Sequence, residues 1–167
     1  TVHKGDFYIG VQPDSYVGRV GQETVANFIA VDWEGSPLPN QTIAVEVVER
    51  RWFSVQEQDD SGRTTWSYDV EEIPLTEGTV TTDANGRATF TFVPPNGGVF
   101  KIRAVSTDAN SRPIISAATT WVVGDGYISW RQQNSNRIDL VVGSPSYAVG
   151  ETAEILITSP FQSESQA

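Results

Sequence analysis

The chain has 167 residues, 38% of them hydrophobic, which is enough for one sizeable core and part of a second. Its 21 acidic and 11 basic residues give a net charge of -10, so binding to nucleic acid or to an anionic membrane surface is not expected. The absence of cysteine excludes disulfides, cysteine-ligated metals and thiol nucleophiles, and no apolar run approaches the ~20 residues that a membrane span needs.

Apolar runs bounded by turn residues predict strands in the N-terminal half. A short strand is expected at 7–11, and residues 15–23 are interpreted as a tight connection. The next strand, 24–33, is apolar on both faces, as a central strand is. A turn rich in Gly and Pro at 34–40 leads into a long strand at 42–53.

An acidic segment follows, and it predicts a long hairpin over 51–72 with its tip at Asp59-Asp60-Ser61-Gly62. Carboxylates on an exposed tip usually keep an edge soluble. A long hairpin is poorly explained by core packing, however, so it is also the best candidate for a contact surface, for a basic partner or Ca²⁺. The carboxylates of this candidate contact surface are Asp59, Asp60, Glu71 and Glu72.

The stretch 81–123 predicts three consecutive strands joined by short turns. Alternating apolar residues mark the first two strands, the breaker segment 94–98 separates them, and the third strand passes through Trp121. We expect these strands to form an antiparallel meander whose apolar side is covered by a second sheet. The residues expected to share that interior are Ala88, Phe90, Phe92, Phe100 and Ile102.

These patterns predict an all-β protein with almost no helix. About seven strands between Phe7 and Val123 favour a seven-stranded antiparallel immunoglobulin-like β-sandwich over residues 1–124. Residues 125–167 are interpreted as a linker and the truncated start of a second sandwich, with strands at 137–142 and 151–158.

A weak internal repeat supports the second sandwich. The segment Val20–Ala26 is similar to Ala148–Glu154, and a Ser-Tyr pair precedes each, Ser15-Tyr16 and Ser146-Tyr147. Two strands rarely stand alone in water, so the second copy should either borrow a partner, from another chain or from the first domain, or be ragged.

Other polar residues receive structural interpretations. His3, the only histidine, precedes the first strand and lacks the oriented partners of a catalytic triad. Two turns share the sequence Thr-Asp-Ala-Asn, with Asp83 and Asp108 as their acidic residues. Each offers too few oxygens for Ca²⁺, so side-chain hydrogen bonding within the turn is the better interpretation. We therefore predict no catalytic residue, no metal and no cofactor.

The C-terminal half resembles the macroglobulin-like domains of bacterial α2-macroglobulins. The resembling pieces are TDANGRATFTFVPPNGGVFKIRAVSTDANSRP and TTWVVGDGYISWRQQNSNRIDLVVGSPSYAVGETAEILITSPF. The order of the turn, the Pro-Pro-x-x-Gly break, Trp-Val, Ser-Tyr-x-x-Gly-Glu-Thr and Ser-Pro-Phe is specific in combination. The resemblance covers 81–161 well and the N-terminal half more loosely.

The resemblance implies a scaffold domain, preceding the bait-region domain, of a large inhibitor that traps endopeptidases after they cleave its bait segment. Its partners would be neighbouring macroglobulin-like domains of the parent chain and, through the parent, the target endopeptidases. The location would be extracytoplasmic, either periplasmic or secreted to the cell surface, with a membrane-anchored parent as a further option. The acidic surface would aid solubility. Many such inhibitors carry a Cys-Gln thioester, which this cysteine-free chain cannot contain.

Two alternatives share the fold class. An immunoglobulin-like stalk domain of a bacterial adhesin would carry a similar TDANG turn, although the Pro-Pro-x-x-Gly and Ser-Pro-Phe elements argue against it. A carbohydrate-binding sandwich would need two or three coplanar tryptophans on an exposed face. Most tryptophans in a sandwich pack in the interior or between domains, and Trp130, in the link between the two units, is the expected inter-domain anchor.

Overall fold

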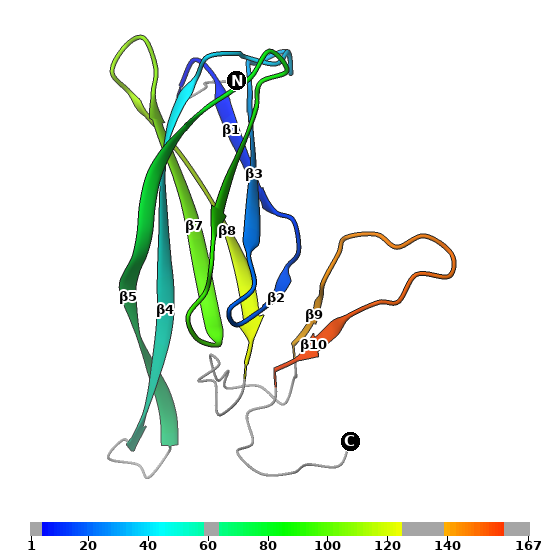
Figure 1. Cartoon of the computed structure of the whole chain (residues 1–167). Coiled ribbons are helices and arrows are strands. Elements are labelled where there is room, and N and C mark those ends of the chain that lie inside the picture. Colours follow the sequence, from blue (N-terminus) through cyan, green and yellow to red (C-terminus); the bar gives the residue numbers. More distant parts are fainter. Residues whose placement is uncertain (1–4, 59–63, 125–138, 159–167) are drawn as a thin grey trace.

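The computed structural model describes residues 5–58, 64–124 and 139–158, and the regular elements in these ranges are all strands (Figure 1). Within these ranges there is no helix with the length and hydropathy to cross a membrane. In chain order the strands are β1 Tyr8–Pro13, β2 Val17–Arg19, β3 Thr24–Val31, β4 Thr42–Gln58, β5 Thr64–Thr81, β6 Arg87–Phe92, β7 Gly98–Thr107, β8 Pro113–Val123, β9 Leu140–Val142 and β10 Ile155–Ile157.

The first eight strands form two sheets, and this confirms the sandwich. One sheet has three strands in the order β1-β3-β6, with β3 central as expected, and the other has five in the order β2-β8-β7-β4-β5. Neighbours are antiparallel except for β2, which runs parallel to β8. Figure 1 shows the two sheets standing face to face.

The core lies between the facing sides of the two sheets. Phe28 and Phe92 come from the three-stranded sheet, and Phe100 and Ile102 come from the five-stranded sheet; all four are buried. The rings of Phe92 and Phe100 are 6.3 Å apart between centroids and tilted by 45°. Full burial of one such side chain stabilises the fold by about 1.5–3 kcal/mol, so these contacts hold the sheets together.

The residues predicted to share one interior do so, but to different extents. Phe92, Phe100 and Ile102 are buried, while Ala88 and Phe90 are half-buried at the margin of the same core. A Cβ atom on Gly78 of β5 would lie 2.6 Å from the Phe90 ring, which shows how closely β5 approaches this margin. The face assignment from alternation is therefore confirmed.

The predicted meander is wrong in one respect. Strand β6 pairs with β3 in the three-stranded sheet, whereas β7 lies in the five-stranded sheet. Of the three predicted strands, β7 and β8 form the expected hairpin. The Pro-rich segment between β6 and β7 is a crossover between sheets, in which Pro94 is fully buried and accepts a hydrogen bond from Gly21 N–H at 2.9 Å. Alternation identifies a strand and its buried face but does not identify its neighbour.

The segment interpreted as a tight connection contains a strand of its own. Strand β2 has three residues and aligns Val17 with Trp121 and Arg19 with Val123. A run this short, with Gly18 at its centre, carries no readable period. Its effect is to cover the edge of β8.

The C-terminal strands β9 and β10 form a separate antiparallel pair, called the strand pair below. The pair borrows the first sandwich as its partner, one of the alternatives raised from the sequence. Tyr16 N–H donates to Gly143 C=O at 2.9 Å, and Gly143 N–H donates to Glu154 C=O at 2.9 Å. The pair therefore lies beside β2, as Figure 1 shows.

The internal repeat has a structural counterpart. Gly21 and Gly150 both have positive φ, 74° and 94°. In the first copy the turn closes through Gln22 N–H to Arg19 C=O, and in the second through Glu151 N–H to Ala148 C=O. Both copies therefore use one glycine turn to lead into a strand, because glycine adopts positive φ at little cost.

Candidate contact surface

The predicted hairpin is formed by β4 and β5, and part of it extends beyond the sandwich. Pairing between β4 and β7 ends at Arg50 and Val99, whereas pairing between β4 and β5 continues to Gln58 and Thr64. The outer part is thus a two-stranded ribbon, and none of the other described strands lies beside it (Figure 1). Its predicted tip, with Asp59 and Asp60, lies outside the described residues.

The two described carboxylates of the candidate surface lie on opposite faces of the ribbon. Glu71 aligns with Arg51 and Glu72 aligns with Arg50, and successive residues of a strand point to opposite sides. The Glu72 carboxylate is 3.0 Å from Lys101 Nζ and 3.4 Å from Arg50 Nε, so two cations already neutralise it. Both carboxylates are exposed. The charge of Glu71 acts on Arg51, which is already paired with Glu49, so Glu71 is the less neutralised of the two.

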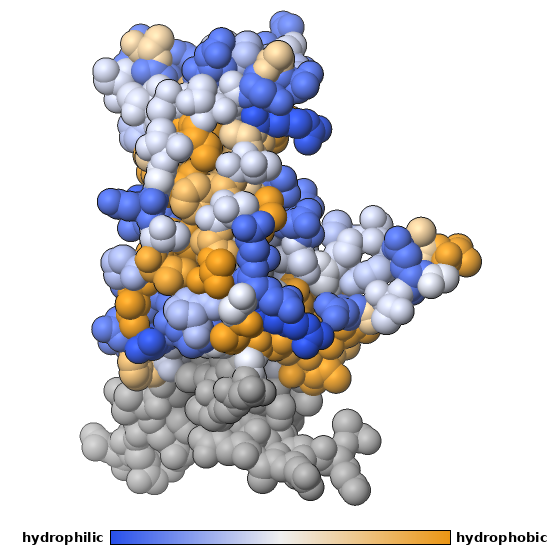
Figure 2. All heavy atoms as spheres, viewed as in Figure 1, coloured by the Kyte–Doolittle hydropathy of each residue, from blue (hydrophilic) through white to orange (hydrophobic). Residues whose placement is uncertain are grey.

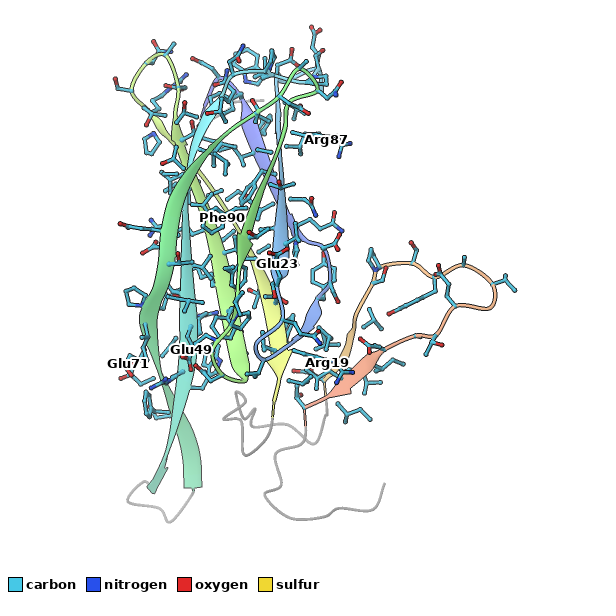
Figure 3. All side chains as sticks on the ribbon, viewed as in Figure 1. Arg19, Glu23, Glu49, Glu71, Arg87 and Phe90 are labelled. Carbon is cyan, nitrogen blue, oxygen red and sulfur yellow. The ribbon has the colours of Figure 1, made fainter. Side chains whose placement is uncertain are left out.

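A charged cluster at the root of the ribbon was missed by the sequence reasoning. Glu49 is buried and accepts two hydrogen bonds from Arg51, at 2.8 and 3.1 Å. This bidentate contact, and the attraction of the same carboxylate, raise the pKa of Arg51. On the other face, the Arg50 guanidinium stacks over the Trp52 ring at 4.6 Å. Figure 3 shows Glu49 and Glu71 at this root.

The two Thr-Asp-Ala-Asn turns use their aspartates as the sequence predicts. Oδ1 of Asp83 accepts the N–H groups of Asn85 and Arg87, at 2.8 and 2.9 Å. Hydrogen bonds from those same backbone groups, with Arg87 the larger cause, lower the pKa of Asp83. The carboxylate is thereby engaged within its own turn.

Asp108 repeats this geometry in a buried setting. Its Oδ1 accepts the N–H groups of Asn110 and Arg112, both at 2.9 Å, and its Oδ2 accepts Nε–H of Arg112 at 2.7 Å. Burial raises the pKa of Asp108, but the hydrogen bonds from Arg112 and Asn110 outweigh it and lower the pKa overall. Arg112 also pairs with Asp6, which fixes the segment before β1.

The remaining candidates do not converge on a reaction centre in the described ranges. No group of three or more His, Cys, Asp or Glu residues there is arranged to hold a metal ion. Trp33 is 58% exposed, whereas Trp52 and Trp121 are half-buried. His3, Trp130 and the Trp66 side chain lie outside what is described, so the inter-domain role of Trp130 stays a prediction.

One apolar surface is exposed on the strand pair. Its residues form cross-strand pairs, Ile155 with Val142 and Ile157 with Leu140, and all four are exposed. Figure 2 shows orange residues gathered where β9 and β10 lie. The sequence reasoning did not single out this surface or the docking of Tyr16, although the repeated Ser-Tyr pair was the available signal.

Comparison with protein families gives a match over most of the sandwich. Residues 10–122 match the model described as bacterial macroglobulin domain 6. The chain is 22% identical over 147 residues to an alpha-2-macroglobulin homolog of Nostoc sp., which covers 88% of this chain and 8% of that protein. It is 34% identical over 91 residues to alpha-2-macroglobulin of Ralstonia nicotianae, covering 54% of this chain and 5% of that protein.

Solved structures show the same fold. The native conformation of E. coli alpha-2-macroglobulin aligns with a TM-score of 0.62 at 18% identity, covering 93% of this chain and 11% of that one. Salmonella alpha-2-macroglobulin reacted with methylamine aligns with a TM-score of 0.60 at 16% identity, covering 93% of this chain and 10% of that one. This chain therefore spans only between 5% and 11% of the length of these proteins.

Proposed function

The chain belongs to the family of bacterial macroglobulin domain 6, and we propose on this premise that it is a scaffold domain of a bacterial α2-macroglobulin-like endopeptidase inhibitor. In such a protein the bait segment and any thioester would lie in other parts of the chain. The role of this domain would be to hold its neighbours in position, without enzymatic activity and without a cofactor.

The observation that carries this proposal is the joining of two strand systems within one chain. Tyr16, Gly143 and Glu154 connect the sandwich to the strand pair through main-chain hydrogen bonds. Three carboxylates of the described ranges are meanwhile engaged in structure: Asp83 and Asp108 close turns, and Glu49 is held by Arg51. A sandwich whose edge is hydrogen-bonded to a second set of strands is suited to holding neighbouring parts of a protein in position.

The domain boundaries of this proposal remain those predicted from the sequence, with a first domain at 1–124 and the start of a second at 125–167. The exposed aliphatic surface of the strand pair supports the second domain, because a sheet face of this kind is normally covered by another sheet. The first copy of the repeat leads into β3, and the sheet that contains β3 is covered in this way by the five-stranded sheet.

The partners of the domain would be the neighbouring macroglobulin-like domains of its parent and, through the parent, endopeptidases in an extracytoplasmic location. The acidic ribbon, with Asp59, Asp60, Glu71 and Glu72, is its proposed contact surface, and Glu71 is the described residue best placed for it. Trp130 is the proposed anchor between domains.

The proposal can be tested in the parent inhibitor by damaging the sandwich core. Phe100→Ala should cost about 3–5 kcal/mol of stability, because Phe100 is fully buried. If the domain is a scaffold, the variant parent should lose its ability to shield a trapped endopeptidase from a large protein substrate. Residual cleavage of the large substrate, compared with that of a small peptide, measures the shielding.

The matched control is Ile115→Ala, since Ile115 is an aliphatic residue of β8 that is 55% exposed. This variant should keep both stability and shielding. The isolated chain, added at excess to the same endopeptidase, should not slow either substrate. Inhibition by the isolated chain, or normal shielding by a parent whose domain is unfolded, would refute the scaffold role.

A further inference from the structure

A row of main-chain hydrogen bonds runs from β8 of the sandwich to the strand pair. Trp121 N–H of β8 donates to Tyr16 C=O at 2.9 Å, Tyr16 N–H donates to Gly143 C=O, and Gly143 N–H donates to Glu154 C=O, the last two also at 2.9 Å. The middle bond is the one that crosses from one strand system to the other. The row thus has a sandwich end, a crossing and a strand-pair end.

The sandwich end is firmly held. Tyr16 C=O also accepts from Thr120 Oγ1–H at 3.4 Å, Ser15 C=O accepts from the same hydroxyl at 3.1 Å, and Thr120 is fully buried. Just beyond β2, Val20 N–H donates to Val123 C=O at 3.0 Å. This side therefore stays in place whether or not anything is docked on it.

The crossing is held by much less. Besides the Tyr16 bond, Ser15 Oγ lies 3.3 Å from Gly143 C=O, and Arg19 pairs with Glu154 at 3.1 Å. The Arg19 and Glu154 side chains are 60% and 56% exposed, so water and salt weaken that ion pair. Figure 3 shows Arg19 at this junction.

The packing across the crossing is also incomplete. An open pocket of about 200 Å³ lies between the two sides, lined by Val17, Arg19, Val123, Glu154, Ile155 and Leu156. Close packing, which would contribute dispersion energy here, is therefore missing over part of the contact.

The strand pair depends on this contact. Its ladder has three residue pairs, and its outer aliphatic residues are exposed. Val141 and Leu156 are the half-buried residues of its strands, and Gly143 just beyond β9 is buried. An isolated two-stranded ladder is at best marginally stable in water, so within the described residues the pair has little to keep it ordered once it leaves β2.

We propose that the contact between the Ser15–Arg19 edge and the strand pair is a two-state switch that couples docking of the pair to its ordering. In one state the pair is docked on β2 and ordered; in the other it is undocked and locally unfolded, while the sandwich stays intact. A force or a competing partner acting on the strand pair would then release it without disturbing the core. The switch is a property of the 167-residue chain itself and is tested on that chain, without the proposed inhibitor.

Amide hydrogen exchange on the whole chain, followed by NMR, tests this directly. The amides of Trp121, Tyr16 and Gly143 report on the sandwich end, the crossing and the strand-pair end. We expect Tyr16 and Gly143 to exchange with the same opening free energy and at least about tenfold faster than Trp121, after correction for intrinsic rates.

A substitution in the pocket sharpens the test. Leu156→Glu places a second carboxylate beside Glu154 and against Val17, so it should speed exchange at Tyr16 and Gly143 together by about tenfold or more and leave Trp121 unchanged. Val149→Glu introduces the same side chain at a fully exposed position of the same segment, and it should change none of the three rates.

Two results would overturn the proposal. If Gly143 stays protected while Tyr16 exchanges, the pair moves away as a folded unit and ordering is not coupled to docking. If all three amides exchange at one rate in the unsubstituted chain, the junction opens only when the sandwich unfolds, and there is no switch.

Discussion

The two Asp-Ala-Asn turns are nearly identical in sequence and in local geometry, yet they occupy different settings. In both, the aspartate N–H donates to the C=O of the arginine four residues on, at 2.8 Å in the first turn and 3.0 Å in the second. The first turn carries the chain from β5 in one sheet to β6 in the other, and the second closes the hairpin between β7 and β8.

The two turns bury different residues: the first buries the residue three positions after its aspartate, and the second buries the aspartate itself. Asp83 is exposed while Gly86 is buried, and Asp108 is buried while Ser111 is exposed. Gly86 and Ser111 both have positive φ, 70° and 61°. A local motif therefore determines the shape of a turn, whereas the surrounding structure determines which of its residues is indispensable.

The largest effect should come from exchanging the residue with positive φ in the first turn. In Gly86→Ser the new Cβ would lie 2.6 Å from Ala30 C=O and 2.9 Å from Leu38 N, so the backbone must shift. We expect a loss of about 2–5 kcal/mol from strain and overpacking. A urea unfolding curve measures it, and a loss below about 1 kcal/mol would show that β3 can yield here.

For the aspartates, the substitution in the second turn should cause the larger loss of stability. Asp108→Ala removes the acceptor for the backbone N–H groups of Asn110, Arg112 and Asp6 and for Nε–H of Arg112, whose contact with Asp6 also holds the segment before β1. Asp83→Ala removes the carboxylate that accepts the N–H groups of Asn85 and Arg87, at an exposed position where water can replace it. The unfolding midpoint in urea should therefore fall further for Asp108→Ala, and equal losses would mean that burial of Asp108 adds nothing.

Lowering the pH should destabilise both turns, so it should distinguish their contributions to stability less than mutation does. The reason is that the folded pKa values of both aspartates are lowered. A lowered pKa stabilises the fold above the unfolded value of about 3.9, and this stability is lost as the pH falls through the folded value. The difference in unfolding midpoint between the unsubstituted chain and Asp108→Asn should thus shrink as the pH falls below the unfolded pKa and through the folded one. A constant difference would exclude an ionised Asp108 as its source.

The smallest effect should be a gain at the second turn. Ser111 is exposed and has the positive φ that glycine tolerates best. Ser111→Gly should therefore relieve strain that the more flexible unfolded chain only partly offsets, for a net stabilisation of about 0.5 kcal/mol. Thermal denaturation beside Gly86→Ser checks the sign, and destabilisation would show that the Ser111 side chain contributes a contact of its own.

Strands and buried faces could be predicted from the sequence because each element carries its own signal. The alternation of Phe90 and Phe92 identified a core face, and the Asp83 and Asp108 turns were recognised from residue type alone. The assignment of β6 to the sheet of β3 could not be predicted, since either neighbour buries the same face. Strand β2 was missed because three residues carry no period.

The candidate contact surface shows a similar limit. Glu71 and Glu72 are adjacent in sequence, which suggested one acidic surface, but a strand sends them to opposite faces. The neutralisation of Glu72 by Lys101 depends on β7 lying two strands away from β5, which is a property of the topology. The cations at the root of the ribbon could be read from the sequence, but their partners could not.

The parallel pairing of β2 with β8 has a consequence for synthesis. Val17 aligns with Trp121, so β2 has no neighbour in its sheet until β8 has been synthesised. Contacts this distant along the chain close late and slowly. On the ribosome, residues 17–19 should therefore lack their sheet neighbour, and stay open to chaperones and proteases, until β8 has left the exit tunnel.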